Sequence, residues 1–273
     1  MPPIVNAGWL TDHGAEVVIC EVGSSMVGGV PETRYAERHI RGARYVSLDT
    51  VLAAPPSATG GRHPLPTPED FARDLGALGI DDEAIVVAYD RRGGGGVAGR
   101  LVWMLRAIGQ EAALLDGGLG GWDGPVESDS IMVDPVRRAV RPWPTRAVAD
   151  ADDVTRHIRA GGVVIDSRDP ARYAGDVEPI DAVAGHIPGA INLAYAENLD
   201  AEFNFRPAAE LAERFAVAAP DADPIVYCGS GVTACHNALV MEYLGLPVPR
   251  LYVGSWSAWS ADPDRAVATG PMP

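Results

Sequence analysis

The strongest constraint on the fold of this chain is that its second half repeats the pattern of its first half. Short apolar runs, a His-Ile segment, a strand followed by a Gly-rich turn, and a segment with Gly and Trp follow one another in the same order twice. The paired landmarks lie 137 to 147 residues apart and are Val17–Cys20 with Val163–Asp166, His39 with His186, Asp90 with Cys228, and Trp122 with Trp259. A near-constant offset indicates repeated structural units, so the 273 residues predict two similar domains.

Each half alternates short apolar runs with stretches of helical periodicity. Ile85–Asp90 and Ile225–Cys228 are such runs, and each precedes a Gly-rich turn and an amphipathic stretch that stops at Gly109 or Gly245. Buried parallel strands read as short apolar runs, and glycine suits the left-handed position after a helix. The sequence therefore predicts an α/β fold of two tandem domains, each a mostly parallel sheet flanked by helices.

The stretch between the repeats reads as a linker. It contains Pro135, Pro142 and Pro144 and lacks clear periodicity, which is typical of an extended connection. We expect a first domain over residues 1–125, a linker over 126–149 and a second domain over 150–273.

Composition narrows the range of functions. The formal net charge of −15 argues against a nucleic-acid partner and against anionic membrane surfaces. An anionic substrate would need a local cluster of positive charge. The sequence has no Gly-rich nucleotide signature and no metal-ligand spacing, so we expect no cofactor.

The compartment is predicted from three further features. The chain has three cysteines, Cys20, Cys228 and Cys235, which does not suggest a disulfide framework and favours a reducing compartment. Its first residues lack the pattern of a signal peptide, and no apolar run is long enough to cross a bilayer. We expect a soluble cytoplasmic protein.

The loop Cys228-Gly-Ser-Gly-Val-Thr-Ala234 carries the clearest chemistry. It follows a buried apolar run and opens a helix, so its glycines let several backbone N–H groups turn inward near the helix N-terminus. Such a cradle favours a thiolate at Cys228 and would equally stabilise a terminal persulfide anion. The alternative is a cysteine that is simply buried at the end of a strand.

Three segments together resemble the rhodanese superfamily of sulfurtransferases: CGSGVTA from Cys228, HIPGA from His186 and GSWSAW from Gly254. The resemblance covers nearly the whole chain, implies two rhodanese-like domains, and is strongest to 3-mercaptopyruvate sulfurtransferases. Members that use thiosulfate typically carry basic residues directly after the cysteine, where this chain has Gly229 and Ser230. The residues that this resemblance assigns to the substrate loop are Gly229, Ser230, Gly231, Val232 and Thr233.

The resemblance also implies residues outside the loop. A histidine in the HxLP context of His63 forms a relay with the loop serine, Ser230, and an upstream aspartate, Asp49. A carboxylate-binding arginine falls at Arg172, and Arg168 is a second candidate after the same strand. On their own, these residues also read as a loop histidine, a turn or cap aspartate, and solvated arginines. Members usually have a further arginine before the HIPG segment, but residues 175–185 contain no basic residue.

The resemblance implies a reaction and its partners. The implied reaction moves sulfane sulfur from 3-mercaptopyruvate through a Cys228 persulfide. The partners would be a small anionic sulfur donor and a thiol acceptor, such as a thioredoxin-like protein, or cyanide. Asp90 matches Cys228 in the first half and cannot accept sulfur, so the first domain is expected to be catalytically silent. His186, Cys20 and Cys235 are expected to be structural.

Other functions stay open at this point. One is a thiosulfate:cyanide sulfurtransferase that uses the same cysteine. Another is a non-catalytic sulfur carrier or regulatory binding module. Phosphatases with a Cys-x5-Arg loop are excluded, because the arginine position is occupied by Ala234.

Overall fold

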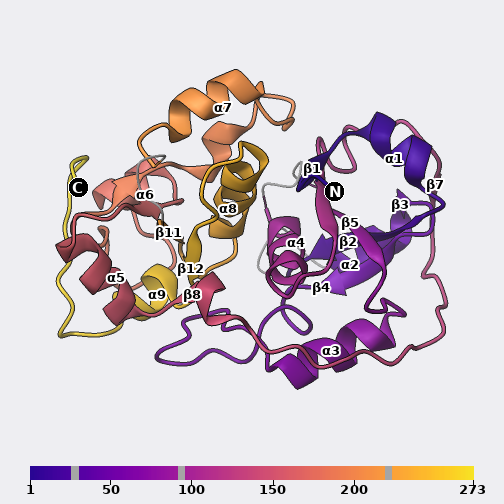
Figure 1. Ribbon diagram of the computed structural model, residues 1–273, viewed down its shortest axis with the longest axis horizontal. Coiled ribbons are helices and arrows are strands. Elements are labelled where there is room, and N and C mark those ends of the chain that lie inside the picture. The colour runs from indigo at the N-terminus through magenta and orange to yellow at the C-terminus, as the bar shows by residue number, and fades with distance from the viewer. Residues whose placement is uncertain (26–30, 92–95, 219–222) are drawn as a thin grey trace. The chain divides into compact units, whose positions relative to one another are not determined.

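The structure is a computed structural model, and it describes residues 1–25, 31–91, 96–218 and 223–273. The chain divides into two compact units. The first unit comprises Met1–Ala54, Pro66–Pro144 and Ala201–Phe205, and the second comprises Pro55–Leu65, Thr145–Asp200 and Arg206–Pro273. Each unit contains its own five-stranded sheet (Figure 1).

The first unit is built on a five-stranded sheet with the order β1-β6-β5-β2-β4. All of its strand pairs are parallel, and helix α4 packs on β5 and β6. The strands are β1 (Ile4–Val5), β2 (Val17–Gly23), β4 (Arg44–Ser47), β5 (Ile85–Tyr89) and β6 (Ala112–Leu115). The helices are α1 (Ala7–His13), α2 (Pro31–Glu37), α3 (Pro68–Ala77) and α4 (Ala98–Ala107), and β3 (His39–Ile40) pairs antiparallel with β7 (Val126–Glu127).

The second unit repeats this arrangement. Its five-stranded sheet has the order β10-β9-β11-β12-β8, and all of its strand pairs are parallel. The strands are β8 (Val148–Ala149), β9 (Val164–Asp166), β10 (Ile191–Asn192), β11 (Ile225–Tyr227) and β12 (Arg250–Tyr252). The helices are α5 (Ala151–Arg159), α6 (Pro170–Ala174), α7 (Ala208–Phe215), α8 (Ala234–Tyr243) and α9 (Ser255–Trp259), with 3-10 turns η1 (Thr145–Ala147) and η2 (Tyr195–Asn198).

The two sheets correspond strand for strand, because β5 and β11 occupy the same central place in their respective orders. The prediction of two α/β units with parallel sheets is therefore confirmed. The predicted helix ends also hold: α4 and α8 stop just before Gly109 and Gly245, which adopt φ of +83° and +69°.

The repeat extends to individual side chains. In the first unit, Nδ1 of His39 lies 2.8 Å from the carbonyl oxygen of Tyr35, and the two rings stack. In the second unit, Nδ1 of His186 lies 2.9 Å from the carbonyl oxygen of Tyr173, with the same stacking. His186 is fully buried. These contacts give it the structural role that the sequence predicted.

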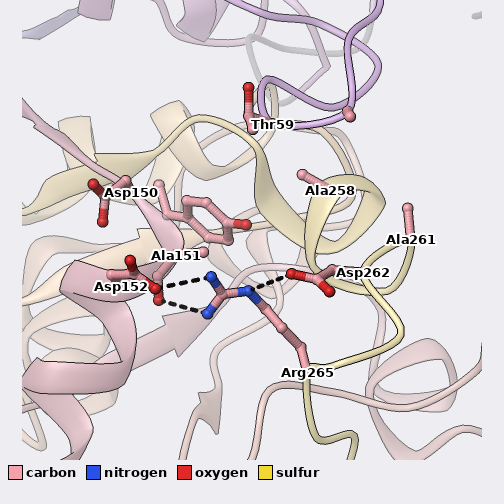
Figure 2. A pocket seen from close by; sticks show the side chains of 10 residues that line it. Thr59, Asp150, Ala151, Asp152, Ala258, Ala261, Asp262 and Arg265 are labelled. Carbon is pink, nitrogen blue, oxygen red and sulfur yellow. Dashed lines mark hydrogen bonds and ion pairs between the residues drawn. The ribbon is translucent and has the colours of Figure 1, made fainter.

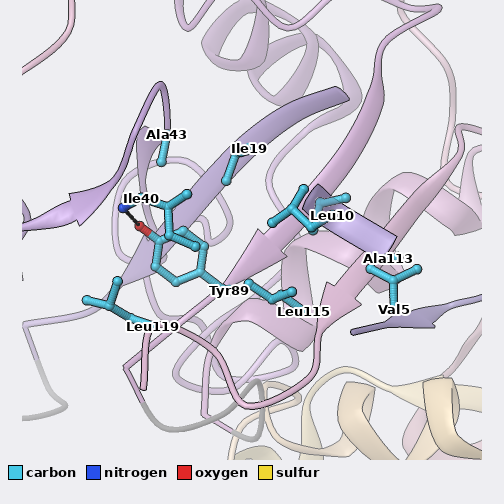
Figure 3. Close-up of a cluster of buried hydrophobic side chains, with 10 residues drawn as sticks. Val5, Leu10, Ile19, Ile40, Ala43, Tyr89, Ala113, Leu115 and Leu119 are labelled. Carbon is cyan, nitrogen blue, oxygen red and sulfur yellow. Dashed lines mark hydrogen bonds between the residues drawn. The ribbon is translucent and has the colours of Figure 1, made fainter. Parts of the chain in front are cut away.

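The core of the first unit gathers apolar side chains around the central strands. Figure 3 shows Leu10 of α1, Tyr89 of β5 and Leu115 of β6 in this cluster. The Tyr89 hydroxyl accepts a hydrogen bond of 3.0 Å from the backbone N–H of Ile40. Burial of a tyrosine ring with its hydroxyl paired stabilises a core without leaving an unsatisfied polar group.

The connection between the repeats differs from the predicted linker over 126–149. Val126–Glu127 forms strand β7 in the first unit, and Val148–Ala149 forms edge strand β8 of the second sheet. Residues 55–65 are grouped with the second unit and residues 201–205 with the first. The sequence predicted that each domain is one continuous segment. These two short segments each belong instead to the unit formed mainly by the other half of the chain.

In the part of the chain that the structure describes, every helix is too short or too polar to cross a membrane.

Candidate active site

Cys228 follows directly after β11, at the carboxyl end of the central strand of the second sheet. Its side chain is almost fully buried. Its backbone N–H donates to the Ser255 hydroxyl at 3.2 Å, and its carbonyl accepts from the N–H of Trp256 at 3.0 Å. The first residues of α9 therefore hold the backbone of Cys228 in place. Ligand sites in parallel sheets gather at this end of the strands.

The loop turns toward α8 through Gly231, whose φ of +75° suits glycine. Val232 and Thr233 precede the helix, and their carbonyls accept the N–H groups of Cys235 and His236 at 3.2 Å each. These two residues join the loop to the helix N-terminus.

His63 and Ser230 meet beside the cysteine loop. Nδ1 of His63 lies 2.8 Å from the Ser230 hydroxyl, and both side chains are buried. The excursion 55–65 positions the histidine, because Ser57 and Gly61 form a two-residue bridge that closes the turn before it. The structure thus brings together two of the predicted site residues that lie far apart in the sequence.

A second link ties the same excursion to the loop. The N–H of Arg62 donates to the Ser257 hydroxyl at 3.1 Å, and the N–H of Ser257 donates to the carbonyl of Gly229 at 2.9 Å. Gly61 makes this approach possible: a Cβ there would lie 2.4 Å from the Gly254 carbonyl oxygen. Residues 61–63 therefore lie directly against the loop.

Two guanidinium groups face Gly229. A Cβ built on this glycine would lie 3.0 Å from Nη2 of Arg62 and 3.5 Å from Nη1 of Arg172. Arg172 was predicted from the sequence, whereas Arg62 was not. Its proximity to His63 was the one signal that could have pointed to it. The glycine leaves this space open, and two forked cations beside it can bind a carboxylate or another small oxyanion.

Two carboxylates accompany these arginines. Arg62 forms an ion pair with Asp181, and Arg172 pairs with Glu178 at 2.6 Å and with Asp181 at 3.4 Å. The side chains of Glu178 and Asp181 are 4% and 8% exposed. Burial of this kind strengthens the pairing.

The two carboxylates titrate in opposite directions. Burial raises the pKa of Asp181, and the nearby Arg62 only partly offsets this. Burial also acts to raise the pKa of Glu178, but bonds from Arg172 and from the backbone N–H groups of Asp181 and Ile180 lower it overall. Relative to its own ordinary value, the ionised form of Asp181 is therefore disfavoured and that of Glu178 is favoured.

Arg168 lies in a different setting from the one predicted. Its guanidinium is buried, pairs with Asp166 at 2.6 Å, donates to the carbonyl of Gly185 at 2.6 Å and lies 4.6 Å from the ring of Trp256. Glu178 approaches it at 3.4 Å. These contacts occupy its donors and are those of a buried structural residue. The role of Arg168 in substrate binding stays a prediction.

Asp49 lies in the first unit, after β4. Its carboxylate accepts hydrogen bonds from the Ser24 hydroxyl at 2.9 Å and from the N–H and hydroxyl of Ser25 at 2.8 and 2.7 Å. His63 belongs to the second unit. The role of Asp49 in orienting His63 therefore stays a prediction.

Asp90 holds the position that corresponds to Cys228 in the first unit. One of its oxygens accepts the N–H groups of Gly96, Val97 and Ala98 at 3.1, 2.7 and 3.1 Å. The carboxylate therefore acts as the hydrogen-bond acceptor for the N–H groups at the start of α4. A covalently attached anion already occupies the place where the second unit would hold a sulfur anion.

The remaining cysteines are buried away from solvent. Burial raises the pKa of the Cys20 thiol to about 12, with Arg44 partly opposing it. The Cys235 thiol is fully buried and donates to the carbonyl of Gly231 at 3.4 Å. These surroundings fit the structural roles expected from the sequence.

A separate pocket of the second unit, with a volume of about 410 Å³, is lined by residues such as Thr59, Asp152, Asp262 and Arg265. Figure 2 shows Arg265 held between the two aspartates, at 2.9 Å from Asp152 and 3.3 Å from Asp262. Asp150 also lines the pocket, so its lining has three carboxylates and one guanidinium, and Cys228 does not line it. The cysteine loop therefore remains the candidate active site.

Known proteins resemble the chain over most of its length. The family model of the rhodanese-like domain matches residues 29–124 and 150–262. A probable 3-mercaptopyruvate sulfurtransferase from Pseudomonas aeruginosa is 41% identical over 249 residues, which is 86% of each chain. A thiosulfate sulfurtransferase from the same organism is 36% identical over 244 residues, 86% of this chain and 87% of its own.

Among solved structures, the 3-mercaptopyruvate sulfurtransferase from Leishmania major superposes with a TM-score of 0.81 at 30% identity, over 95% of this chain and 74% of its own. The matches cover both halves of the chain, and the curated relatives are named as enzymes that transfer sulfur. The chain belongs to the rhodanese family and is a tandem-domain sulfurtransferase.

Proposed function

We propose that the protein transfers sulfane sulfur from 3-mercaptopyruvate to a thiol or to cyanide through a persulfide on Cys228. One observation carries this proposal: His63 lies 2.8 Å from the hydroxyl of Ser230, which belongs to the same loop as Cys228. A hydroxyl paired with an imidazole serves a leaving group that must gain a proton, and the enolate released from mercaptopyruvate is such a group.

In the first half-reaction, the Cys228 thiolate attacks the sulfur of mercaptopyruvate. A sulfur–sulfur bond forms and the carbon–sulfur bond breaks, so that the electron pair stays on the carbon fragment as pyruvate enolate. The proton of the donor thiol ends on this enolate carbon and gives pyruvate. The enzyme keeps a persulfide anion, and both atoms and charge balance without an external oxidant.

Ser230 and His63 have different roles in stabilising the enolate. In the tautomer that carries hydrogen on Nδ1, the imidazole donates to the Ser230 oxygen, and the hydroxyl hydrogen is free to point at the carbonyl oxygen of the donor. Charge builds on that oxygen as the carbon–sulfur bond breaks. A hydrogen bond aimed at developing charge lowers the barrier.

The second half-reaction returns the thiolate. An acceptor thiolate or cyanide attacks the outer sulfur, the sulfur–sulfur bond breaks toward Cys228, and a new persulfide or thiocyanate leaves. The N-terminus of α8, next to the cysteine loop, would stabilise the persulfide anion that forms between the two half-reactions.

Thiosulfate is the second candidate donor, because both Arg62 and Arg172 face Gly229. The thiosulfate sulfurtransferase from Pseudomonas aeruginosa is also a relative of the chain. However, Asp181 and Glu178 pair with these arginines, which leaves little net positive charge for a compact dianion. This local balance favours a donor with a single carboxylate.

Mass spectrometry of the intact protein tests the proposal. After incubation with mercaptopyruvate and removal of small molecules, the peptide that contains Cys228 should carry one additional sulfur atom, which dithiothreitol should remove. Thiosulfate under matched conditions should load it more slowly. Faster loading by thiosulfate would make thiosulfate the donor, and the absence of loading by either donor would overturn the proposed chemistry.

A further inference from the structure

We infer that Arg62 supplies the second anion-binding guanidinium of the Cys228 site and that Asp181 is its built-in competitor, which the anionic group of the donor must displace. The inference rests on the proposed function for the identity of the donor. It concerns two residues that the sequence does not single out.

The position of Arg62 supports its role. Its Nη2 lies 3.0 Å from the place of a Cβ on Gly229, closer than either terminal nitrogen of Arg172. Its Nε is buried and has no hydrogen-bond partner among the described residues. A buried guanidinium nitrogen without a partner is costly, and an oxyanion that binds beside Gly229 could satisfy it.

The route by which Arg62 reaches the loop explains why residues 175–185 need no arginine. The backbone of Arg62 is bound to Ser257, which is in turn bound to the Gly229 carbonyl. The arginine is therefore delivered from the 55–65 excursion, next to His63. The segment before His186 instead supplies Glu178 and Asp181.

Asp181 already occupies one face of Arg62. It forms an ion pair with Arg62, and its other oxygen lies 3.4 Å from Nη2 of Arg172. It therefore contacts both arginines, as a bound carboxylate would. Two carboxylates cannot share these donors without repulsion, so donor binding and the Arg62–Asp181 pair should exclude each other.

The two residues should affect the Michaelis constant in opposite directions. Arg62→Gln should raise KM for mercaptopyruvate about tenfold and leave kcat within a few-fold, because it removes a charge-assisted bond present before and during the reaction. Arg62→Lys should recover part of this loss. Asp181→Asn should lower KM by several-fold, because it removes the competitor while keeping the shape of the side chain.

The double variant separates displacement from general charge repulsion. If Asp181 acts by occupying Arg62, Asp181→Asn should help much less in the Arg62→Gln background. An equal gain in both backgrounds would show simple repulsion and overturn the competitor role. An exposed ion pair of 3.3 Å joins Arg206, which precedes α7, to Glu210 of α7. It provides matched controls: Arg206→Gln and Glu210→Gln should leave KM unchanged.

A readout without sulfur transfer keeps the inference independent of the donor. Iodoacetate and iodoacetamide alkylate thiols alike but differ in charge, and their rate ratio at the Cys228 peptide reports attraction of anions to the site. Arg62→Gln should lower this ratio several-fold, and Asp181→Asn should raise it. A ratio that both variants leave unchanged overturns the inference. A ratio that responds as expected in a protein that mercaptopyruvate does not load would sustain the inference and refute the proposed donor.

Discussion

His63 and Ser230 are 167 residues apart in the sequence, yet Nδ1 of the imidazole lies 2.8 Å from the serine hydroxyl. The contact exists because residues 55–65 leave the first half of the chain and are grouped with the second unit. A proton relay can therefore be assembled from two segments of the chain that contribute to one unit.

Replacement of His63 tests this relay. His63→Asn should lower kcat for mercaptopyruvate by about 10²-fold, because the enolate loses assistance from a positioned hydroxyl. Steady-state kinetics with mercaptopyruvate and thiosulfate provide the measurement. Loss of sulfite from thiosulfate needs no proton on carbon, so any turnover of thiosulfate should fall much less.

If His63 and Ser230 act together, the losses of activity caused by replacing each of them should not add. Ser230→Ala should resemble His63→Asn, and the double variant should be little worse than either single variant, since the two side chains act as one unit. Independent, multiplying losses would show that the two residues do not work together.

Cys228→Ser should abolish persulfide formation and lower kcat/KM by at least about 10³-fold, because a hydroxyl is far less acidic and less nucleophilic than a thiol. Thermal unfolding should stay near that of the parent protein. Cys235→Ser and Cys20→Ser are the matched controls, and both should still load sulfur at Cys228. Near-normal activity of Cys228→Ser would place the nucleophile elsewhere.

Asp90→Ala should lower the stability of the protein without a large effect on its turnover. The loss of an acceptor for three N–H groups at the start of α4 should cost roughly 2 kcal/mol in the free energy of unfolding. Turnover per folded molecule should stay within a few-fold of that of the parent protein, because the Asp90 carboxylate is already bound to the N–H groups of α4. Denaturant titration and steady-state rates measure the two quantities, and Asp90→Asn, which retains one oxygen acceptor, should destabilise less.

A loss of turnover on the scale of Cys228→Ser would contradict the silent role of the first unit. It would show that Asp90 takes part in the chemistry.

The sequence predicted the fold well because the repeat and the strand pattern are local properties. It missed strand β8, since two residues of an edge strand leave no periodic signal.

The site was predicted less completely, because long-range contacts decide it. Arg168 and Arg172 both follow β9 and look equivalent in the sequence, but Arg168 is buried against Asp166, whereas Nη1 of Arg172 lies beside Gly229. Arg62 could not be assigned without knowing where residues 55–65 fold. Glu178 and Asp181 lie in a segment with no periodic signal, and only the fold shows that they pair with Arg172 and Arg62.

Donor choice can be tested by adding charge to the loop. Ser230→Lys should move preference toward thiosulfate by kcat/KM, because an ammonium beside Cys228 tips the local balance of two arginines and two carboxylates toward positive. Ser230→Met has similar length without charge and is the matched control. A shift of equal size in both variants would mean that loss of the hydroxyl, and not charge, sets the preference.

Anion binding should strengthen as the pH falls from neutrality toward the pKa of Asp181. Burial raises that pKa above its ordinary value, so Asp181 takes up a proton at a higher pH than an exposed aspartate does. The charged groups that face it are Arg62, Arg172 and Glu178. The pKa of Glu178 is lowered, so Glu178 keeps its charge to a lower pH than an ordinary glutamate does. Protonation of Asp181 releases Arg62.

Pyruvate is a suitable probe, because its carboxylate stays ionised at these pH values and it does not react with the thiol. The measurement is its protection of Cys228 from iodoacetamide, taken at each pH as the concentration that halves the alkylation rate. That concentration should fall with decreasing pH in the parent protein. Asp181→Asn should bind pyruvate more tightly at neutral pH and show a nearly flat profile, since it has no proton to gain there. A profile that slopes equally in both proteins would assign the pH dependence to another group, because Asp181 is the only titrating difference between them.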